Sequence, residues 1–399
     1  MDKISRRNFL SVCGAMCLWA GFAGPAGPLA GVAEASRRGP KSVGDVHIFR
    51  GDAPERLWKF SREAFSYEKA GSGKTVCNIC PNHCMLSNGD RSICRSKVNI
   101  DGKLYTLAYG NPCSVHVDPV EKKPLFHFMP QSRALSVAAT GCSFRCLNCQ
   151  NWEISQVRPE DVRTYELFPV QAAERAQLAG ADSIAYTYSE PLTFFEYTID
   201  TARIAHEKGI KNLLISNGYV NRDPLLELCR VIDAANINLK SFDDEIYRKL
   251  NGGRLKPVLE TLKTLAGQGV HLEITTLIVP DYVDDPAMIR SMCRWIADNL
   301  GPDHPLHFLR FFPQYKLDRL PPTPVRLLEQ MRDTAMEEGI RYVYIGNVAG
   351  HEASHTWCHS CGELLVRRQG YKITTPGISE GKCTSCGTAV PGVWSGKNT

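Results

Sequence analysis

The sequence predicts an α/β protein in which a parallel array of βα units is flanked on each side by a small cysteine-rich module. Six short β-type runs alternate with helical stretches between about residues 134 and 346. Most of the 16 cysteines fall into three clusters with CxxC or CxxxC steps, a spacing that metals impose and disulfides do not need. The formal net charge of +5 is too small to indicate a nucleic-acid-binding protein.

The β-type runs cover residues 134–139, 183–188, 212–216, 237–240, 271–279 and 307–312, and helical stretches include 170–179, 192–208 and 225–235. This alternation implies parallel strands joined by right-handed crossovers, in an open doubly wound sheet or in a full or partial barrel spanning residues 131–350. In each of these architectures, chemistry collects at the carboxyl ends of the strands.

The first 35 residues are expected to be a twin-arginine signal peptide. Ser5 to Leu10 form the motif SRRNFL, an apolar stretch follows, and residues 33–35 make an A-x-A cleavage site. This signal predicts a periplasmic, exported protein, or a cytoplasmic one if the signal is not used. No later apolar run is long enough for a membrane span, so none is expected in the mature chain. Residues 36–75 are predicted to be a linker, with a short helix at most over 57–67.

Two four-cysteine sets flank the central array. In a predicted module over residues 76–130, the thiolates can hold either a zinc ion or a fully ligated iron–sulfur cluster. In a second module over residues 351–399, two CxxC knuckles resemble a zinc ribbon or a rubredoxin-like site with a structural zinc. The first set is Cys77, Cys80, Cys84 and Cys94, and the second is Cys358, Cys361, Cys383 and Cys386. Cys113, Cys229 and Cys293 are predicted to be core thiols.

A third cysteine set directly follows the first β run. Cys142, Cys146 and Cys149 have CxxxCxxC spacing, so they can hold three irons of a [4Fe–4S] cluster and leave the fourth iron without a protein ligand. Such an open iron can bind a small molecule and pass an electron to it directly. The alternative is a zinc knuckle with a distant fourth ligand.

This loop resembles the signature of the radical S-adenosylmethionine (radical SAM) superfamily. The resemblance implies a partial (β/α)6 barrel, a [4Fe–4S] cluster ligated by the three catalytic cysteines, and S-adenosylmethionine bound to the open iron. Reductive cleavage would then yield methionine and a 5′-deoxyadenosyl radical that abstracts hydrogen. Asn238 stands where the family has Asp. The residues that match the family's cofactor contacts at the strand ends are Ser189, Glu190, Asn217, Asn238, Lys240 and Ile278.

Segments 118–128, 149–156, 310–313 and 344–348 look like the radical enzyme of the AmmeMemoRadiSam system, a group related to pyruvate formate-lyase activating enzymes. That resemblance implies Memo-like and AMMECR-like partner proteins and an electron donor. The sequence is thus interpreted as an oxidoreductase or activase-like radical SAM enzyme acting on a protein or peptide. The alternatives are a glycyl-radical enzyme activase and a non-catalytic iron–sulfur or zinc protein for electron transfer or partner binding.

Overall fold

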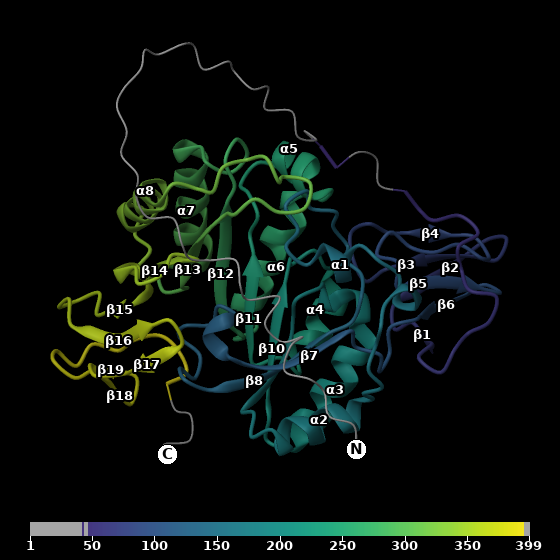
Figure 1. The fold of residues 1–399 in the computed structure, drawn as a ribbon, viewed down its shortest axis with the longest axis horizontal. Coiled ribbons are helices and arrows are strands. Elements are labelled where there is room, and N and C mark those ends of the chain that lie inside the picture. Colours follow the sequence, from purple (N-terminus) through teal and green to yellow (C-terminus); the bar gives the residue numbers. More distant parts are fainter. Residues whose placement is uncertain (1–41, 44–46, 395–399) are drawn as a thin grey trace, which may run out of the picture. The chain divides into compact units, whose positions relative to one another are not determined.

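An eight-stranded sheet forms the centre of the computed structural model, which describes residues 42–43 and 47–394 (Figure 1). The strand order is β14-β13-β12-β11-β10-β9-β8-β7, and every neighbouring pair from β8 to β14 is parallel, whereas β7 runs antiparallel to β8. The strands are β7 (Ser114–Pro119), β8 (Arg133–Ala138), β9 (Ser183–Tyr186), β10 (Lys211–Ser216), β11 (Ala234–Asn238), β12 (His271–Ile278), β13 (Leu306–Arg310) and β14 (Val343–Gly346).

Helices connect the successive parallel strands and pack on the sheet through apolar side chains. In α7, the residues Ile289, Met292, Cys293 and Ile296 recur at helical spacing and are fully buried in the main core. The longer helices are α2 (Pro169–Leu178), α3 (Phe195–Glu207), α4 (Arg222–Cys229), α6 (Leu255–Gly267), α7 (Pro286–Leu300) and α8 (Val325–Glu337). The shorter ones are α1 (Trp152–Ser155), α5 (Asp244–Ile246), the π-helical turn η5 (Tyr247–Asn251) and the 3₁₀ turns η2 (Val120–Lys122), η3 (Pro159–Asp161), η4 (Pro191–Phe194) and η6 (Glu352–Ser354).

The sheet confirms the predicted α/β class and contains all six predicted strands. The helix expected over 225–235 ends at Cys229, and its last two positions, Ala234 and Ala235, already belong to β11. Alanine favours helices, but both residues are fully buried, so packing between neighbouring strands overrides that preference. Strands β7 and β14 extend the predicted array at its two edges.

The amino-terminal end of the array is filled by the segment that joins β7 to β8. Val120, Leu125 and Phe128 are buried there against alanines of β8, β9 and β11. Small side chains on the strands leave room for the large ones of this segment. The barrel interior is therefore closed at this end, and the opposite end carries the strand carboxyl termini.

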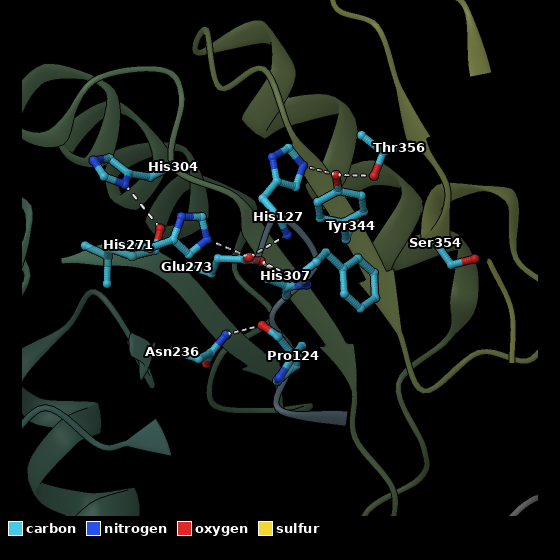
Figure 2. A network of polar contacts seen from close by, with 12 residues as sticks. Pro124, His127, Asn236, His271, Glu273, His304, His307, Tyr344, Ser354 and Thr356 are labelled. Carbon is cyan, nitrogen blue, oxygen red and sulfur yellow. Dashed lines mark hydrogen bonds and ion pairs between the residues drawn. The ribbon is translucent and has the colours of Figure 1, made fainter. Parts of the chain in front are cut away.

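A buried carboxylate organises the same closed end (Figure 2). Glu273 on β12 has no exposed surface, and it accepts hydrogen bonds from the backbone amides of Phe126 and His127 at 3.0 and 2.7 Å. It also contacts Nε2 of His271 at 3.0 Å and Nε2 of His307 at 2.6 Å. Although burial opposes ionisation, these histidine contacts hold the pKa of Glu273 well below its usual range.

The cysteine-rich segment before the sheet folds as two small sheets, β1-β6-β5 and β2-β3-β4. Residues 47–75, expected to be linker, belong to this module, and turns with the short strand β1 stand where a helix was expected over 57–67. Arg91, only 2% exposed, fixes the early part of this segment by an ion pair with Asp52 at 3.0 Å. The strands are β1 (Arg62–Glu63), β2 (Tyr67–Ala70), β3 (Lys74–Cys77), β4 (Met85–Leu86), β5 (Lys97–Ile100) and β6 (Lys103–Thr106).

The segment after β14 forms short antiparallel strands with a core of their own. Leu365 and Val366 are fully buried there and pack in one cluster with Tyr342 and Tyr344 of the sheet region. The strands are β15 (Thr356–Trp357), β16 (Leu364–Gln369), β17 (Lys372–Thr374), β18 (Ile378–Ser379) and β19 (Lys382–Cys383).

In the described residues, no helix combines the length and apolar character that crossing a membrane requires. The predicted signal peptide, residues 1–35, lies outside the described part of the chain.

Candidate active site

The loop after β8 brings the three predicted catalytic cysteines together at the carboxyl ends of the strands. Each sulfur has a polar neighbour within the described structure, and these neighbours come from four different segments. Cys142 Sγ accepts hydrogen bonds from the Phe144 amide (3.4 Å) and Asn217 Nδ2 (3.7 Å), Cys146 Sγ accepts one from Asn251 Nδ2 (3.2 Å), and Cys149 Sγ lies 3.1 Å from Ser155 Oγ.

Packing against buried aromatic side chains holds the cysteine loop in place. Phe144 is fully buried and lies 4.9 Å from the ring of Tyr219, measured between ring centroids. The π-helical turn η5 binds the loop backbone, since the amide of Arg145 donates to the carbonyl of Asn251 at 2.8 Å. Irregular helical turns of this kind are frequent at functional sites.

The chemistry of the three thiols fits an iron–sulfur cluster. Burial raises the pKa values of Cys142 and Cys149, and neighbouring negative groups raise them further. A buried thiolate becomes favourable when a metal supplies the compensating positive charge. Several buried polar atoms beside the loop also have no hydrogen-bond partner within the described structure: Thr140 Oγ1, Arg145 Nε, Asn148 Oδ1 and Asn251 Oδ1.

Glu190 links the loop after β9 to the loop after β10. Its carboxylate is 2% exposed and accepts hydrogen bonds from Ser216 Oγ at 2.7 Å and from the Asn217 amide at 2.9 Å. Burial raises the pKa of Glu190, and these hydrogen bonds oppose that rise. Ser189, the preceding residue, donates from its hydroxyl to the carbonyl of Ala139. Both predicted residues are therefore held beside the cysteine loop.

Asn217 and Asn238 lie at neighbouring strand ends with different partners. Asn217 Nδ2 donates to Ser143 Oγ at 3.0 Å, which directs this side chain to the cysteine loop. Asn238 Nδ2 donates to the Ser216 carbonyl at 3.4 Å. The two amides therefore support the strand ends, and Asn217 does so directly beside Cys142.

Lys240 supplies positive charge to the same region. Burial raises the pKa values of Cys149 and Glu190, and the nearby ammonium of Lys240 opposes that rise in both. Within the described residues, this ammonium has no hydrogen bond or ion pair, whereas the backbone amide of Lys240 donates to the Tyr247 hydroxyl at 3.0 Å. An unpaired ammonium at strand ends can bind a ligand carboxylate.

Ile278 differs from the other predicted cofactor contacts. Its side chain is fully buried in the main core, on the same face of β12 as Thr276, which contacts Met292 of α7. The Ile278 side chain therefore points to the helices and away from the cysteine loop. Its backbone carbonyl accepts a hydrogen bond from Thr323 Oγ1 at 2.5 Å.

A polar cluster between the closed end and the cysteine loop was not predicted as a site. Asp118 accepts hydrogen bonds from Lys123 Nζ and Ser136 Oγ, both at 2.7 Å, and from the hydroxyl of Tyr188. Burial opposes ionisation, but these donors and Lys122 hold the pKa of Asp118 well below its usual range. Burial lowers the pKa of Lys123 to about 8. In the sequence, the only signal was the Asp-Pro-Val-Glu-Lys-Lys run.

The carboxy-terminal cysteines form a compact set. Within the described residues, Cys358, Cys361, Cys383 and Cys386 form a group whose Sγ atoms all lie within 4.8 Å of one another. The Cys358–Cys386 and Cys361–Cys383 sulfur distances are 3.6 and 3.7 Å. This arrangement can hold a metal ion, as the two CxxC knuckles predicted.

A parallel βα array with three partly buried thiols on the loop after its first parallel strand defines an iron–sulfur enzyme of the radical SAM type. The family model described as "Radical SAM superfamily" matches residues 136–295. The chain is also 44% identical over 331 residues to the uncharacterized protein MJ0808 of Methanocaldococcus jannaschii, covering 82% of this chain and 98% of that one. The chain belongs to the radical SAM superfamily.

Two more distant matches are a curated enzyme and a solved structure. Pyruvate formate-lyase 1-activating enzyme of Escherichia coli strain K12 is 28% identical over 226 residues, which is 51% of this chain and 89% of that enzyme. Among solved structures, a radical SAM methyltransferase from Sphaerobacter thermophilus covers 55% of this chain and 68% of its own, with 16% identity and a TM-score of 0.44.

Proposed function

We propose that this radical SAM enzyme cleaves S-adenosylmethionine reductively and uses the resulting radical to abstract hydrogen from a protein or peptide substrate. The observation that carries this proposal is the set of three partly buried thiols at the strand ends, with Lys240 and Glu190 beside them. When bound, a [4Fe–4S] cluster supplies the electron that splits the cofactor into methionine and a 5′-deoxyadenosyl radical.

The residues of this chain bind and orient the reactants. Cys142, Cys146 and Cys149 would ligate the cluster, and Lys240 would pair with the methionine carboxylate. Glu190 sets the relative position of the loops after β9 and β10, and its carboxylate would pair with the amino group of the cofactor. Buried Phe144 and the closed amino-terminal end of the array keep water from reaching the site through the interior of the array.

A macromolecular substrate agrees with two features. The amino-terminal end of the array is filled, so a substrate has to approach at the strand carboxyl ends. The Escherichia coli relative carries the name of an enzyme that activates pyruvate formate-lyase, which is itself a protein. This likeness also favours a second candidate, a glycyl-radical enzyme activase. A stable glycyl radical on a partner, observed by electron paramagnetic resonance (EPR), would distinguish that candidate.

The remaining expectations stand as proposals beside this one. We propose that a zinc ion binds the four carboxy-terminal cysteines, because sulfur distances of 3.6 and 3.7 Å suit tetrahedral coordination. Assignment to the AmmeMemoRadiSam group, with Memo-like and AMMECR-like partners and a separate electron donor, is supported by the four sequence segments that suggested it. Export through the twin-arginine route would place cofactor loading before translocation.

The spectroscopic titration with S-adenosylmethionine tests the proposal. The anaerobically reconstituted, reduced full chain should show an EPR signal that changes when S-adenosylmethionine is added, because the cofactor occupies the open iron. A signal that stays unchanged up to saturating cofactor would support the non-catalytic electron-transfer alternative instead.

A further inference from the structure

The four cysteines of the amino-terminal module lie close together, and the backbone amide of Cys77 donates to the carbonyl of Cys84 at 3.1 Å. Cys77 and Cys84 are each 6% exposed and belong to the main hydrophobic core. Cys80 packs against the same core, and the thiols interact electrostatically with one another and with Cys94. Four thiols this close together can ligate one metal centre, whose positive charge would offset the cost of holding thiolates in an apolar environment.

The spacing of these thiols differs from that of the carboxy-terminal set. A tetrahedral zinc ion with bonds of about 2.3 Å places its sulfurs about 3.8 Å apart. The carboxy-terminal sulfurs come close to this separation, with two distances of 3.6 and 3.7 Å. In the part of the chain that the structure describes, they are also the one group of three or more ligand atoms that all lie within 4.8 Å of one another. Among the described residues, no three of the amino-terminal thiols meet that limit, which suits the wider ligand spacing of a cluster better than that of one ion.

The catalytic cysteines provide an internal comparison. Cys142, Cys146 and Cys149 also lie close enough to interact electrostatically, and they too fall outside that 4.8 Å limit among the described residues. A cubane cluster carries its irons at separate corners, so its ligands lie further apart than the ligands of one ion. The amino-terminal set therefore shares the wide spacing of the iron–sulfur loop and lacks the close spacing of the carboxy-terminal set.

The amino-terminal set also touches the catalytic loop directly. Asn82, between Cys80 and Cys84, donates from Nδ2 to the carbonyl of Ser143 at 2.9 Å. On the other side, a Cβ on Gly141 would collide with the carbonyl of Cys94, so only glycine permits this approach. The amino-terminal cysteine segment therefore meets the catalytic loop at two points, one on each side of Cys142.

Two arginines lie at this junction. Arg145 Nη2 donates to the Ile93 carbonyl at 3.3 Å, and Arg95 Nη1 donates to Gln156 Oε1 at 3.3 Å. Both guanidinium groups are in electrostatic range of Cys94 and Cys142. Positive charge shared by the two sets would offset the negative charge of two thiolate-ligated clusters held close together.

We infer that Cys77, Cys80, Cys84 and Cys94 bind a second, fully ligated [4Fe–4S] cluster that passes electrons to the cluster at the catalytic loop. A reduced one-electron carrier of the flavodoxin or ferredoxin class would give one electron to the second cluster. That cluster is reoxidised when the electron moves to the catalytic cluster, and the electron is finally consumed in breaking the carbon–sulfur bond of S-adenosylmethionine. The relay role rests on the proposed function, whereas the metal content does not.

Metal analysis of a full-length variant without the catalytic ligands tests the assignment. With Cys142, Cys146 and Cys149 all changed to Ala, the anaerobically reconstituted protein should retain about four irons and about four sulfides per chain, with a Mössbauer spectrum of a [4Fe–4S] cluster. Adding Cys80→Ala and Cys84→Ala should remove this iron. The matched change Cys361→Ala should leave the iron in place, because it lies in the carboxy-terminal set.

The wild-type protein gives a second measurement that does not depend on how the variants fold. It should contain about eight irons per chain, whereas about four irons together with two zinc ions would overturn the inference. A triple variant with zinc and no sulfide would overturn it as well. Failure of the proposed function looks different: both clusters would be present, and S-adenosylmethionine would not change the EPR signal.

The relay role has its own readout. In Cys80→Ser, cleavage of S-adenosylmethionine driven by reduced flavodoxin should slow about tenfold or more, while cleavage driven by dithionite should remain close to the wild-type rate. Equal rates with flavodoxin in the two proteins would contradict the relay.

Discussion

Asn251 donates a hydrogen bond from its side-chain amide to the sulfur of Cys146 across 3.2 Å. Asn251 is 1% exposed and ends the π-helical turn η5, which also binds the backbone of the cysteine loop. Hydrogen bonds to ligand sulfurs withdraw charge from an iron–sulfur cluster and raise its reduction potential. The turn therefore positions the loop, and its amide would tune the potential of a cluster held by Cys146.

Changing Asn251 to Leu should lower the reduction potential of the catalytic cluster. The substitution keeps the volume and removes the donor, so the shift should be on the order of tens of mV. An EPR-monitored redox titration measures it. The control is Asn299→Leu on the exposed face of α7, whose amide caps only the Trp295 carbonyl. A potential equal to wild type in Asn251→Leu would show that the amide does not act on the cluster.

Changing Lys240 to Met should weaken the binding of S-adenosylmethionine. The ammonium has no partner within the described structure and lies at the strand ends beside Cys149. One charge-assisted hydrogen bond contributes about 1.5–3 kcal/mol, so the dissociation constant should rise about tenfold to a hundredfold. Equilibrium binding to the reconstituted enzyme measures this, with the exposed Lys256→Met as control. Equal weakening in both variants would argue against a contact with the cofactor.

Changing Gly141 to Ala should separate the catalytic loop from the amino-terminal module. Gly141 has a φ of 102°, and its Cβ would meet Ser96 Oγ at 2.6 Å as well as the Cys94 carbonyl. Gly209→Ala is a matched control, since Gly209 has a φ of 70° with open space around it. The control should lose only about 1–2 kcal/mol of stability from its backbone conformation.

Iron content per chain and the midpoint of thermal unfolding distinguish the two glycine variants. We expect Gly141→Ala to lose iron and to unfold at a clearly lower temperature than Gly209→Ala. If both variants lose stability equally and keep their iron, the close contact between the modules does not support cluster binding.

Changing Asp118 to Asn should destabilise the protein, because Lys123 would stay buried without its ionic partner. The cost should be about 3 kcal/mol near neutral pH. Burial already lowers the pKa of Lys123 to about 8, even though Asp118 raises it. Without Asp118 this pKa falls further, so the folded variant binds fewer protons than its unfolded chain, and its stability relative to wild type rises with pH.

Urea unfolding at about pH 6.5 and about pH 9 measures this effect, with the larger difference from wild type expected at the lower pH. Asp303→Asn breaks a half-exposed pair with Arg341 and should cost less than about 1 kcal/mol at either pH. A difference that is constant between the two pH values would show that Lys123 does not lose its proton in the variant.

The central features of the fold were predictable from local patterns. Strand-forming runs buried between helices have periodicities that a sequence shows directly, and the CxxxCxxC spacing identified the loop after β8. The first cysteine module was less predictable, because its residues 47–75 gain order from contacts such as the Arg91–Asp52 pair, which joins positions far apart in the chain.

The contacts that tune the site were not predictable for the same reason. Asn251 reaches Cys146 from more than a hundred residues away, and Asp118 meets Tyr188 across the interior of the array. The side chain of Ile278 was expected at the cofactor, but the alternation of β12 turns it to the helices. Sequence motifs identified the strand ends, whereas the direction in which each side chain points depends on strand register and packing.

Cleavage of S-adenosylmethionine by the reconstituted full chain tests the central claim most directly. Under reducing, anaerobic conditions, the wild type should release 5′-deoxyadenosine and methionine in equal amounts. Cys146→Ala should abolish this release, and Cys293→Ala, a change in the core of α7, should retain it. If the wild type binds its iron and still releases no 5′-deoxyadenosine, the proposed reaction is contradicted.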